Sequence, residues 1–115
     1  MSSIQTKRVY DPPTAGDGLR VLVDRLWPRG VAKAKLKLDR WAKEIAPSHE
    51  LRRWYHRDMS RFAEFRRRYV AELAAHAPVL DELRAQARER TVTLLTASTQ
   101  LERSHAAVLA ELLTS

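Results

Sequence analysis

The stretch VLVDRLWPRG, residues 21–30, decides how the rest of the chain is interpreted. Its first three residues are contiguous and apolar, as in a buried strand, and Pro28 cannot continue a central ladder. We therefore predict a strand over 19–27. Charged and aromatic side chains crowd the point where this strand runs out, and they are our first candidates for a ligand-binding site: Asp24, Arg25, Trp27 and Arg29.

Two further segments have strand character. Residues 4–11 (IQTKRVYD) alternate weakly, and residues 91–98 (TVTLLTAS) form the clearest β-branched, apolar run. The first two strands could form an antiparallel pair across the proline- and glycine-rich loop that joins them. After a long helical crossover, the strand at 91–98 should lie parallel to the strand at 19–27, so that their carboxyl ends share one edge of the sheet.

Helical spacing characterises the region between these strands. It predicts a helix over 35–46, a second over 48–57 with Ser48 as N-cap, and a long amphipathic helix over 60–77 capped by Ser60. Pro47 separates the first two of these helices.

Two more helices complete the pattern. Pro78 fits the first turn of a helix over 78–90, and Thr99 with Glu102 matches a capping box that begins a last helix over about 100–113. The order of elements predicts an α/β fold: a small single domain over 1–115 with a three-stranded or slightly larger sheet and a long helical insertion between the second and last strand.

Composition excludes several classes of protein. The 115 residues include no cysteine, which rules out structural disulfides, thiolate zinc sites and cysteine nucleophiles. The sequence has no glycine-rich phosphate-binding loop, no G-x-S-x-G nucleophile elbow and no histidines at the spacing of metal ligands. We therefore expect no cofactor and no metal. No signal peptide or membrane span is evident either, and we expect a soluble, cytoplasmic protein.

The charge points toward anionic partners. Lys and Arg number 21 against 14 Asp and Glu, a net charge of +7, and arginine dominates the clusters. Such a surplus attracts phosphates, and the planar guanidinium group suits bidentate contacts to them. A solvated helix face explains many of these arginines equally well.

The last helix supplies a further candidate. His105 follows Leu101 by four residues and precedes Val108 by three, so it should lie on the apolar face. It is either a core histidine or a proton-transfer group, since its ordinary pKa suits catalysis near neutrality. The start of the same helix offers unpaired amide groups to an anion.

The central helices add three residues to this list. Ser48 caps a helix that carries Arg52, which could reach an anion. Glu72 stands four residues after Arg68, which indicates either a structural ion pair or an acid–base group positioned by that arginine.

Trp27 and Trp41 fit the core, although an indole beside a phosphate site could also stack on a base.

Taken together and in order, several segments closely resemble the YeaO-like proteins, small bacterial domains of unknown function. These segments are KRVYD, DGLRVLVDRLWPRG, LDRWAKEIAPSHELRRWYH, FRRRYVAEL and TVTLLTAS with the later HAAVLAELL. The resemblance covers nearly the whole chain, and it implies that the following positions belong to the family's motif: Asp24, Arg25, Trp27, Pro28, Arg29, Gly30, Ser48, Leu51, Arg52, Phe65, Tyr69, Glu72 and His105.

The chain departs from the family pattern near the last strand. Thr96, Thr99 and Ser104 stand where the pattern implies a tyrosine, a lysine and an asparagine. These departures favour the remaining motif residues as the part that could still act: Arg25, Arg29, Arg52, Glu72 and His105.

Three functions are compatible with these features. The first is an enzyme or ligand-binding domain for a phosphorylated or nucleotide-like molecule, with arginines holding the anion and His105 or Glu72 transferring a proton. The second is a nucleic-acid-binding, possibly regulatory, protein without catalytic activity that uses its arginine-rich helices. In the third, the polar cluster binds no ligand and is an internal ion-pair network that stabilises the fold. Replacing Arg29 should then destabilise the protein strongly.

Overall fold

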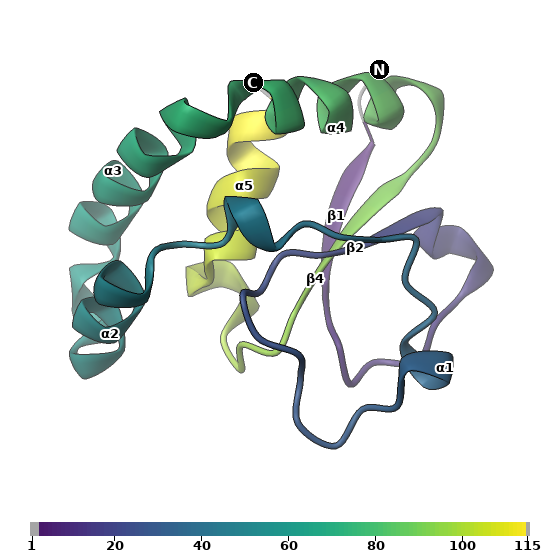
Figure 1. The fold of residues 1–115 in the computed structure, drawn as a ribbon, viewed down its shortest axis with the longest axis horizontal. Coiled ribbons are helices and arrows are strands. Elements are labelled where there is room, and N and C mark those ends of the chain that lie inside the picture. The colour runs from purple at the N-terminus through teal and green to yellow at the C-terminus, as the bar shows by residue number, and fades with distance from the viewer. Residues whose placement is uncertain (1–2, 115) are drawn as a thin grey trace.

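Residues 3–114 are described by a computed structural model, in which four strands form one parallel sheet (Figure 1). The strands lie in the order β1-β4-β2-β3. All five residues of β4 are buried, as expected for the central strand of a sheet covered on both faces. The prediction that the last strand lies parallel beside the second is confirmed. The bounds are β1 Ile4–Arg8, β2 Leu19–Leu22, β3 Arg40–Trp41 and β4 Val92–Thr96.

The predicted antiparallel pairing of the first two strands is wrong. Strand β4 lies between them, and Val92 faces Ile4 on one side and Leu19 on the other. Strand β4, whose five residues are all buried, thus has both edges paired, by β1 and by β2. Gly18, with φ of 61°, starts β2 so close to β4 that a Cβ atom would collide with the carbonyl oxygen of Thr91.

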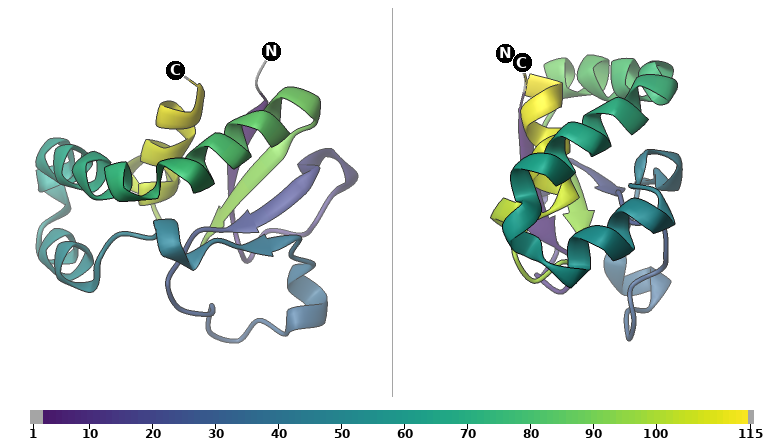
Figure 2. Two further views of the ribbon diagram at one scale, coloured as in Figure 1. Left: turned by 45° about the horizontal axis from the view of Figure 1, so that its top comes forward. Right: turned by 90° about the vertical axis from the view of Figure 1, so that its left-hand side faces the viewer.

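Four of the helices, α2 to α5, pack on one face of the sheet (Figures 1 and 2). Their apolar sides meet Val21 and Leu94, whereas Leu22 and Leu95 point to the opposite face. That opposite face is covered by the segment around the short helix α1, which packs Leu36 against it. The bounds are α1 Lys33–Leu36, α2 His49–Arg57, α3 Phe62–Leu73, α4 Ala77–Glu89 and α5 His105–Thr114.

The single helix predicted over 35–46 is wrong. Helix α1 ends at Leu36, Trp41 belongs to β3, and Lys43–Ile45 is one 3-10 turn. The amide of Ala42 donates to the carbonyl of Leu22 at 2.8 Å, so the segment extends the edge of the sheet. Pairing with β2 thus overrides a helical pattern in the sequence.

Two predicted helix starts are displaced. Ser60 does not cap a helix, because the Asp58 side chain accepts the Ser60 amide at the head of a 3-10 turn. The Thr99 capping box does not form either, since Leu101–Arg103 is a 3-10 turn and α5 begins only at His105. The break between α3 and α4 is confirmed, with Pro78 in the first turn of α4.

The architecture is a small α/β domain with the predicted long insertion between the second and last strands. The insertion holds β3 as well as helices, which brings the sheet to four strands. Within residues 3–114, no helix has the length and apolar character needed to cross a membrane.

Candidate functional site

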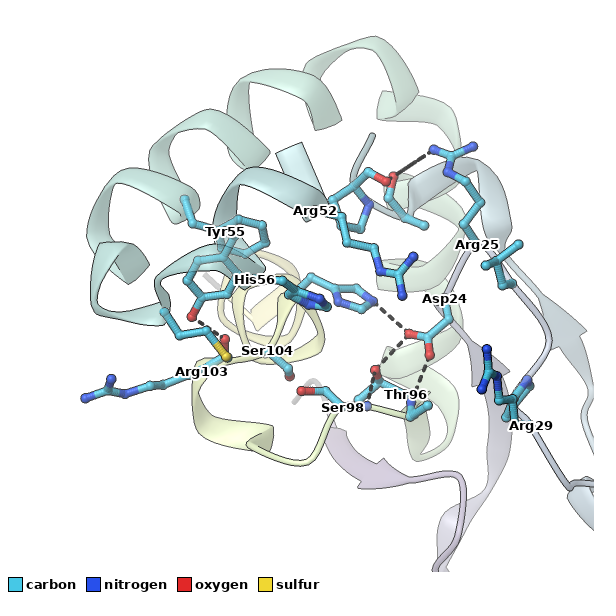
Figure 3. A pocket seen from close by; sticks show the side chains of 18 of the residues that line it. Asp24, Arg25, Arg29, Arg52, Tyr55, His56, Thr96, Ser98, Arg103 and Ser104 are labelled. Carbon is cyan, nitrogen blue, oxygen red and sulfur yellow. Dashed lines mark hydrogen bonds and ion pairs between the residues drawn. The ribbon is translucent and has the colours of Figure 1, made fainter. Parts of the chain in front are cut away.

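A pocket of about 360 Å³ lies beyond the carboxyl ends of β2 and β4 (Figure 3). Helices α2 and α5 contribute its other walls, in keeping with the usual position of ligand sites in open parallel sheets. Six of the eight site residues that the sequence indicated line this one pocket: Asp24, Arg25, Trp27, Arg29, Arg52 and His105.

The other two, Ser48 and Glu72, lie outside this pocket and bind each other. The Ser48 amide donates to Glu72 Oε1 at 2.8 Å and its hydroxyl donates to Oε2 at 2.6 Å. Ser48 Oγ also accepts the Leu51 amide at 3.2 Å, which confirms it as the N-cap of α2. Arg68 pairs with Glu64 rather than with Glu72. The carboxylate of Glu72 therefore anchors the start of α2.

His105 and Asp24 form the centre of the pocket wall. His105 Nε2 lies 3.0 Å from Asp24 Oδ1 and 3.0 Å from the carbonyl oxygen of Val23. Both neighbours are acceptors, so Nε2 carries the hydrogen. Because His105 is the first residue of α5, this contact ties the helix start to the end of β2.

The Asp24 carboxylate is satisfied by three donors. Besides His105, the hydroxyl of Thr96 donates to Oδ1 and the amide of Ala97 donates to Oδ2, each at 2.8 Å. Burial raises the pKa of Asp24, but the hydrogen bonds and the charge of His105 outweigh it and lower the pKa overall. Asp24 thus stays ionised, and its acceptor capacity is largely used.

Four arginines give the pocket its charge: Arg25, Arg29, Arg52 and Arg103. Arg29 and Arg52 lie beside Asp24, the Arg25 guanidinium turns away from Asp24, and Arg103 lies at the other end and points away (Figure 3). Arg25 contacts only the carbonyls of Ala46 and Pro47, at 3.4 Å. In the described part of the chain none of the four has a carboxylate within ion-pair distance.

Arginines elsewhere on the surface are often paired. Arg66 binds Glu111 at 2.6 Å, Arg68 binds Glu64 at 2.8 Å, and Arg40 binds Glu82 at 2.8 Å. Since Asp24 is the one acidic residue lining the pocket among residues 3–114, the arginines there leave an excess of positive charge.

His56 adds a second imidazole to the same wall. Partial burial lowers its pKa, and the neighbouring charges of Arg52 and His105 lower it further. His56 stands four positions after Arg52 on the same side of α2 and was not among the site residues predicted from the sequence.

The floor of the pocket is aromatic. The Tyr55 and Phe65 rings stack with centroids 4.1 Å apart, and the Tyr55 hydroxyl donates to the Arg103 carbonyl at 2.7 Å. Trp27 packs edge-on against Trp41 at 5.5 Å, and Trp41 Nε1 donates to the Asp24 carbonyl at 2.7 Å. Both indoles pack against the apolar cluster around Leu22, and Trp27 also lines the pocket.

Several lining residues were not identified from the sequence as site candidates. Tyr10 and Arg103 reach the pocket from the end of β1 and the turn before α5, where nothing in the local pattern distinguishes them. Ser104 accepts the Ala107 amide at 3.3 Å at the head of α5. Across residues 3–114, no three acidic or histidine side chains are grouped so as to hold a metal ion.

Comparisons with known proteins identify the family. Residues 3–115 match the family model described as the inactive DUF488-N3 subclade. The chain is 49% identical over 113 residues to the uncharacterized protein YeaO of Escherichia coli (strain K12), with 98% of each chain covered. It is 48% identical over 110 residues to an uncharacterized protein of Mycobacterium tuberculosis (strain ATCC 25618 / H37Rv), covering 96% of this chain and 92% of the relative. No solved structure is significantly similar. The chain therefore belongs to the YeaO-like family, in the subclade described as inactive DUF488-N3.

Proposed function

We propose that this protein binds a small phosphorylated molecule in the pocket at the carboxyl ends of β2 and β4. The observation that carries the proposal is a set of guanidinium groups that line the pocket and have no carboxylate within ion-pair distance in residues 3–114, those of Arg25, Arg29 and Arg52. Asp24 supplies only one negative charge against them, and its oxygens already accept bonds from Thr96, Ala97 and His105, so a positive surplus remains. A phosphate would supply the missing negative charge with charge-assisted hydrogen bonds.

Binding without turnover is the simplest form of this function. The description of the matched family as an inactive subclade supports it. His105 then acts by position, since its Nε2 hydrogen is directed at Asp24 and Val23 rather than into the pocket. Glu72 has no part in the proposed site, because Ser48 occupies both of its oxygens.

Thermal unfolding with a panel of anions tests the proposal. Inorganic phosphate, sugar phosphates and mononucleotides are compared at low and moderate salt with the wild type, Arg29→Ala and Arg52→Gln. We expect stabilisation by a phosphorylated compound that persists at moderate salt and is lost in both variants. The matched control is Arg88→Ala, which removes an exposed arginine of α4 far from the pocket residues and should leave the stabilisation unchanged. Equal stabilisation in Arg29→Ala, Arg52→Gln and the control would disprove the proposed site.

Nucleic-acid binding is the second candidate, and the outer face of α2 favours it. Arg53 and Arg57 are exposed there beside Arg52, and within residues 3–114 they have no carboxylate in ion-pair distance. Neutralising several phosphates makes affinity fall steeply with salt, unlike binding in a pocket. A steep salt dependence for duplex DNA that is reduced by Arg53→Ala and Arg57→Ala, but not by Arg29→Ala, would favour this candidate.

A further inference from the structure

The rim of the pocket carries exposed apolar side chains. Tyr10 is 50% exposed and Leu26 is 64% exposed, and no other large hydrophobic side chain in residues 3–114 is exposed. Both line the same pocket. Ligand pockets are lined mainly by apolar and aromatic side chains, so two exposed apolar side chains at one cavity are suited to contact a ligand.

The Tyr10 ring is held in place. Its hydroxyl donates to the Arg29 carbonyl at 3.3 Å, which links the end of β1 to the loop after β2. The guanidinium of Arg8 lies 5.1 Å from the ring centroid and is itself fixed by a 3.0 Å bond from Nε to the Ser98 carbonyl. A ring that is already oriented loses little conformational freedom when a ligand packs on it.

The loop after β2 brings part of the apolar rim close to two of the arginines, Arg25 and Arg29. Leu26 stands between Arg25 and Trp27, and Tyr10 is bonded to the backbone of Arg29. A ligand that used both would need a flat apolar part joined to an anionic part over a short distance. The volume of about 360 Å³ lies near the lower end for small-molecule pockets, which suits one such unit and not a chain of them.

We infer that the ligand is a nucleoside monophosphate, whose base packs on Tyr10 and Leu26 while its phosphate meets the arginines. This inference rests on the proposed phosphate-binding function and adds the base to it. Every nucleobase has an aromatic face that can stack on a tyrosine ring, so the contact selects for a base and not for one particular base.

Titration calorimetry with four probes tests the inference: adenosine monophosphate, ribose 5-phosphate, adenosine, and a short single-stranded oligonucleotide with a 5′-phosphate. We expect adenosine monophosphate to bind about tenfold more tightly than ribose 5-phosphate, as one stacked base would give. Tyr10→Ser should remove that difference. Tyr10→Phe keeps the ring and should retain most of the difference, which separates stacking from the hydrogen bond to Arg29.

The possible outcomes distinguish failure of the base contact from failure of the proposed phosphate binding. Equal affinity for adenosine monophosphate and ribose 5-phosphate would overturn the base contact and leave phosphate binding intact. No binding of either would overturn both. Much tighter binding of the oligonucleotide, with a steep salt dependence, would also overturn the inference, because the base contact would then belong to a nucleic-acid strand. Circular dichroism of each variant confirms that the fold is retained.

Discussion

His105 Nε2 lies 3.0 Å from Asp24 Oδ1, and this contact joins the first turn of α5 to the end of β2. Asp24 also accepts the Ala97 amide just beyond β4, so one carboxylate ties together three segments that are far apart in the sequence. The side chains are only 15% and 16% exposed, which makes the pair part of the pocket wall and limits its screening by solvent.

Replacing this carboxylate by its amide should weaken the fold. In Asp24→Asn the new NH2 group faces donors, so at least one of the bonds from Thr96 and Ala97 is lost. We expect a loss of about 1–3 kcal/mol in the free energy of unfolding, measured by urea denaturation. The matched control Asp81→Asn, at an exposed ion pair with Arg84, should change stability by less than about 1 kcal/mol. Similar losses in the two variants would contradict this account of Asp24.

The ionisation of Asp24, in its pair with His105, makes the free energy of unfolding depend on pH. The pKa of Asp24 is lowered in the folded protein, so its contribution is complete above the pKa of the unfolded carboxyl, about 3.9. It is lost as the pH falls through the lowered folded value. The stability difference between wild type and Asp24→Asn, measured by urea denaturation over a pH series, should therefore be constant near neutrality and shrink below about pH 4. A difference that persists in acid would show that Asp24 acts through shape alone.

A second buried pair holds the opposite face of the sheet. Arg20 binds the Asp17 carboxylate and donates twice to the Leu36 carbonyl, at 3.0 and 2.8 Å, which fixes α1 to the sheet. Arg20→Met would leave Asp17 short of a partner, and we expect destabilisation of about 3–5 kcal/mol by urea denaturation. Glu82→Gln, which breaks only the exposed pair with Arg40, is the control. A loss below about 1 kcal/mol in Arg20→Met would mean that Lys7 and Thr14 together satisfy Asp17.

Ligand binding should be accompanied by proton uptake at His56. Burial, followed by the charges of Arg52 and His105, lowers the pKa of His56, so this imidazole is largely neutral at pH 7 in the free protein. A bound phosphate would favour the charged form, and affinity should rise as the pH falls from about 8 to 6.5. Calorimetry in buffers of different ionisation enthalpy measures the protons taken up. His56→Gln should flatten the profile, whereas His49→Gln, outside the pocket, should not; an unchanged profile in His56→Gln would refute the coupling.

Without ligand, the free energy of unfolding should decrease as the pH falls, whereas ligand affinity should rise. With its pKa lowered by folding, His56 binds its proton more readily in the unfolded chain, whose pKa is about 6.5. The contribution of His56 to stability therefore decreases as the pH falls through this range. Urea denaturation of wild type and His56→Gln between pH 5 and 8 should show the wild type losing more stability in acid.

Much of the sheet and of the pocket follows from the sequence, and the exceptions have physical causes. The two adjacent strands could be recognised from their apolar runs, although they end at Leu22 and Thr96 and not at the predicted residues 27 and 98. Parallel pairing then brings the polar residues that follow them together. The residues of β3 could not be recognised, since only pairing with β2 distinguishes Trp41 from a helical residue. Tyr10 and Arg103 were missed for a related reason: they reach the pocket through long-range contacts that no local pattern encodes.

The variant Glu72→Gln tests whether Glu72 stabilises the fold or contributes to ligand binding. It accepts the Ser48 amide and hydroxyl at 2.8 and 2.6 Å, and in Glu72→Gln one of these donors would face the amide NH2 group. We expect a loss of about 1–2 kcal/mol in the free energy of unfolding, measured by urea denaturation. Ligand affinity, measured by calorimetry, should change less than twofold, because Glu72 does not line the main pocket.

The variant Arg52→Gln should show the reverse pattern. Its side chain is exposed and makes no ion pair within residues 3–114, so stability should stay within about 0.5 kcal/mol while affinity for a phosphorylated ligand falls clearly. Because the two variants act on different observables, each serves as the control for the other. If Glu72→Gln instead abolished binding and kept full stability, the carboxylate would have to be treated as a ligand-contacting group, and the hydrogen bonds from Ser48 would have to break when the ligand binds.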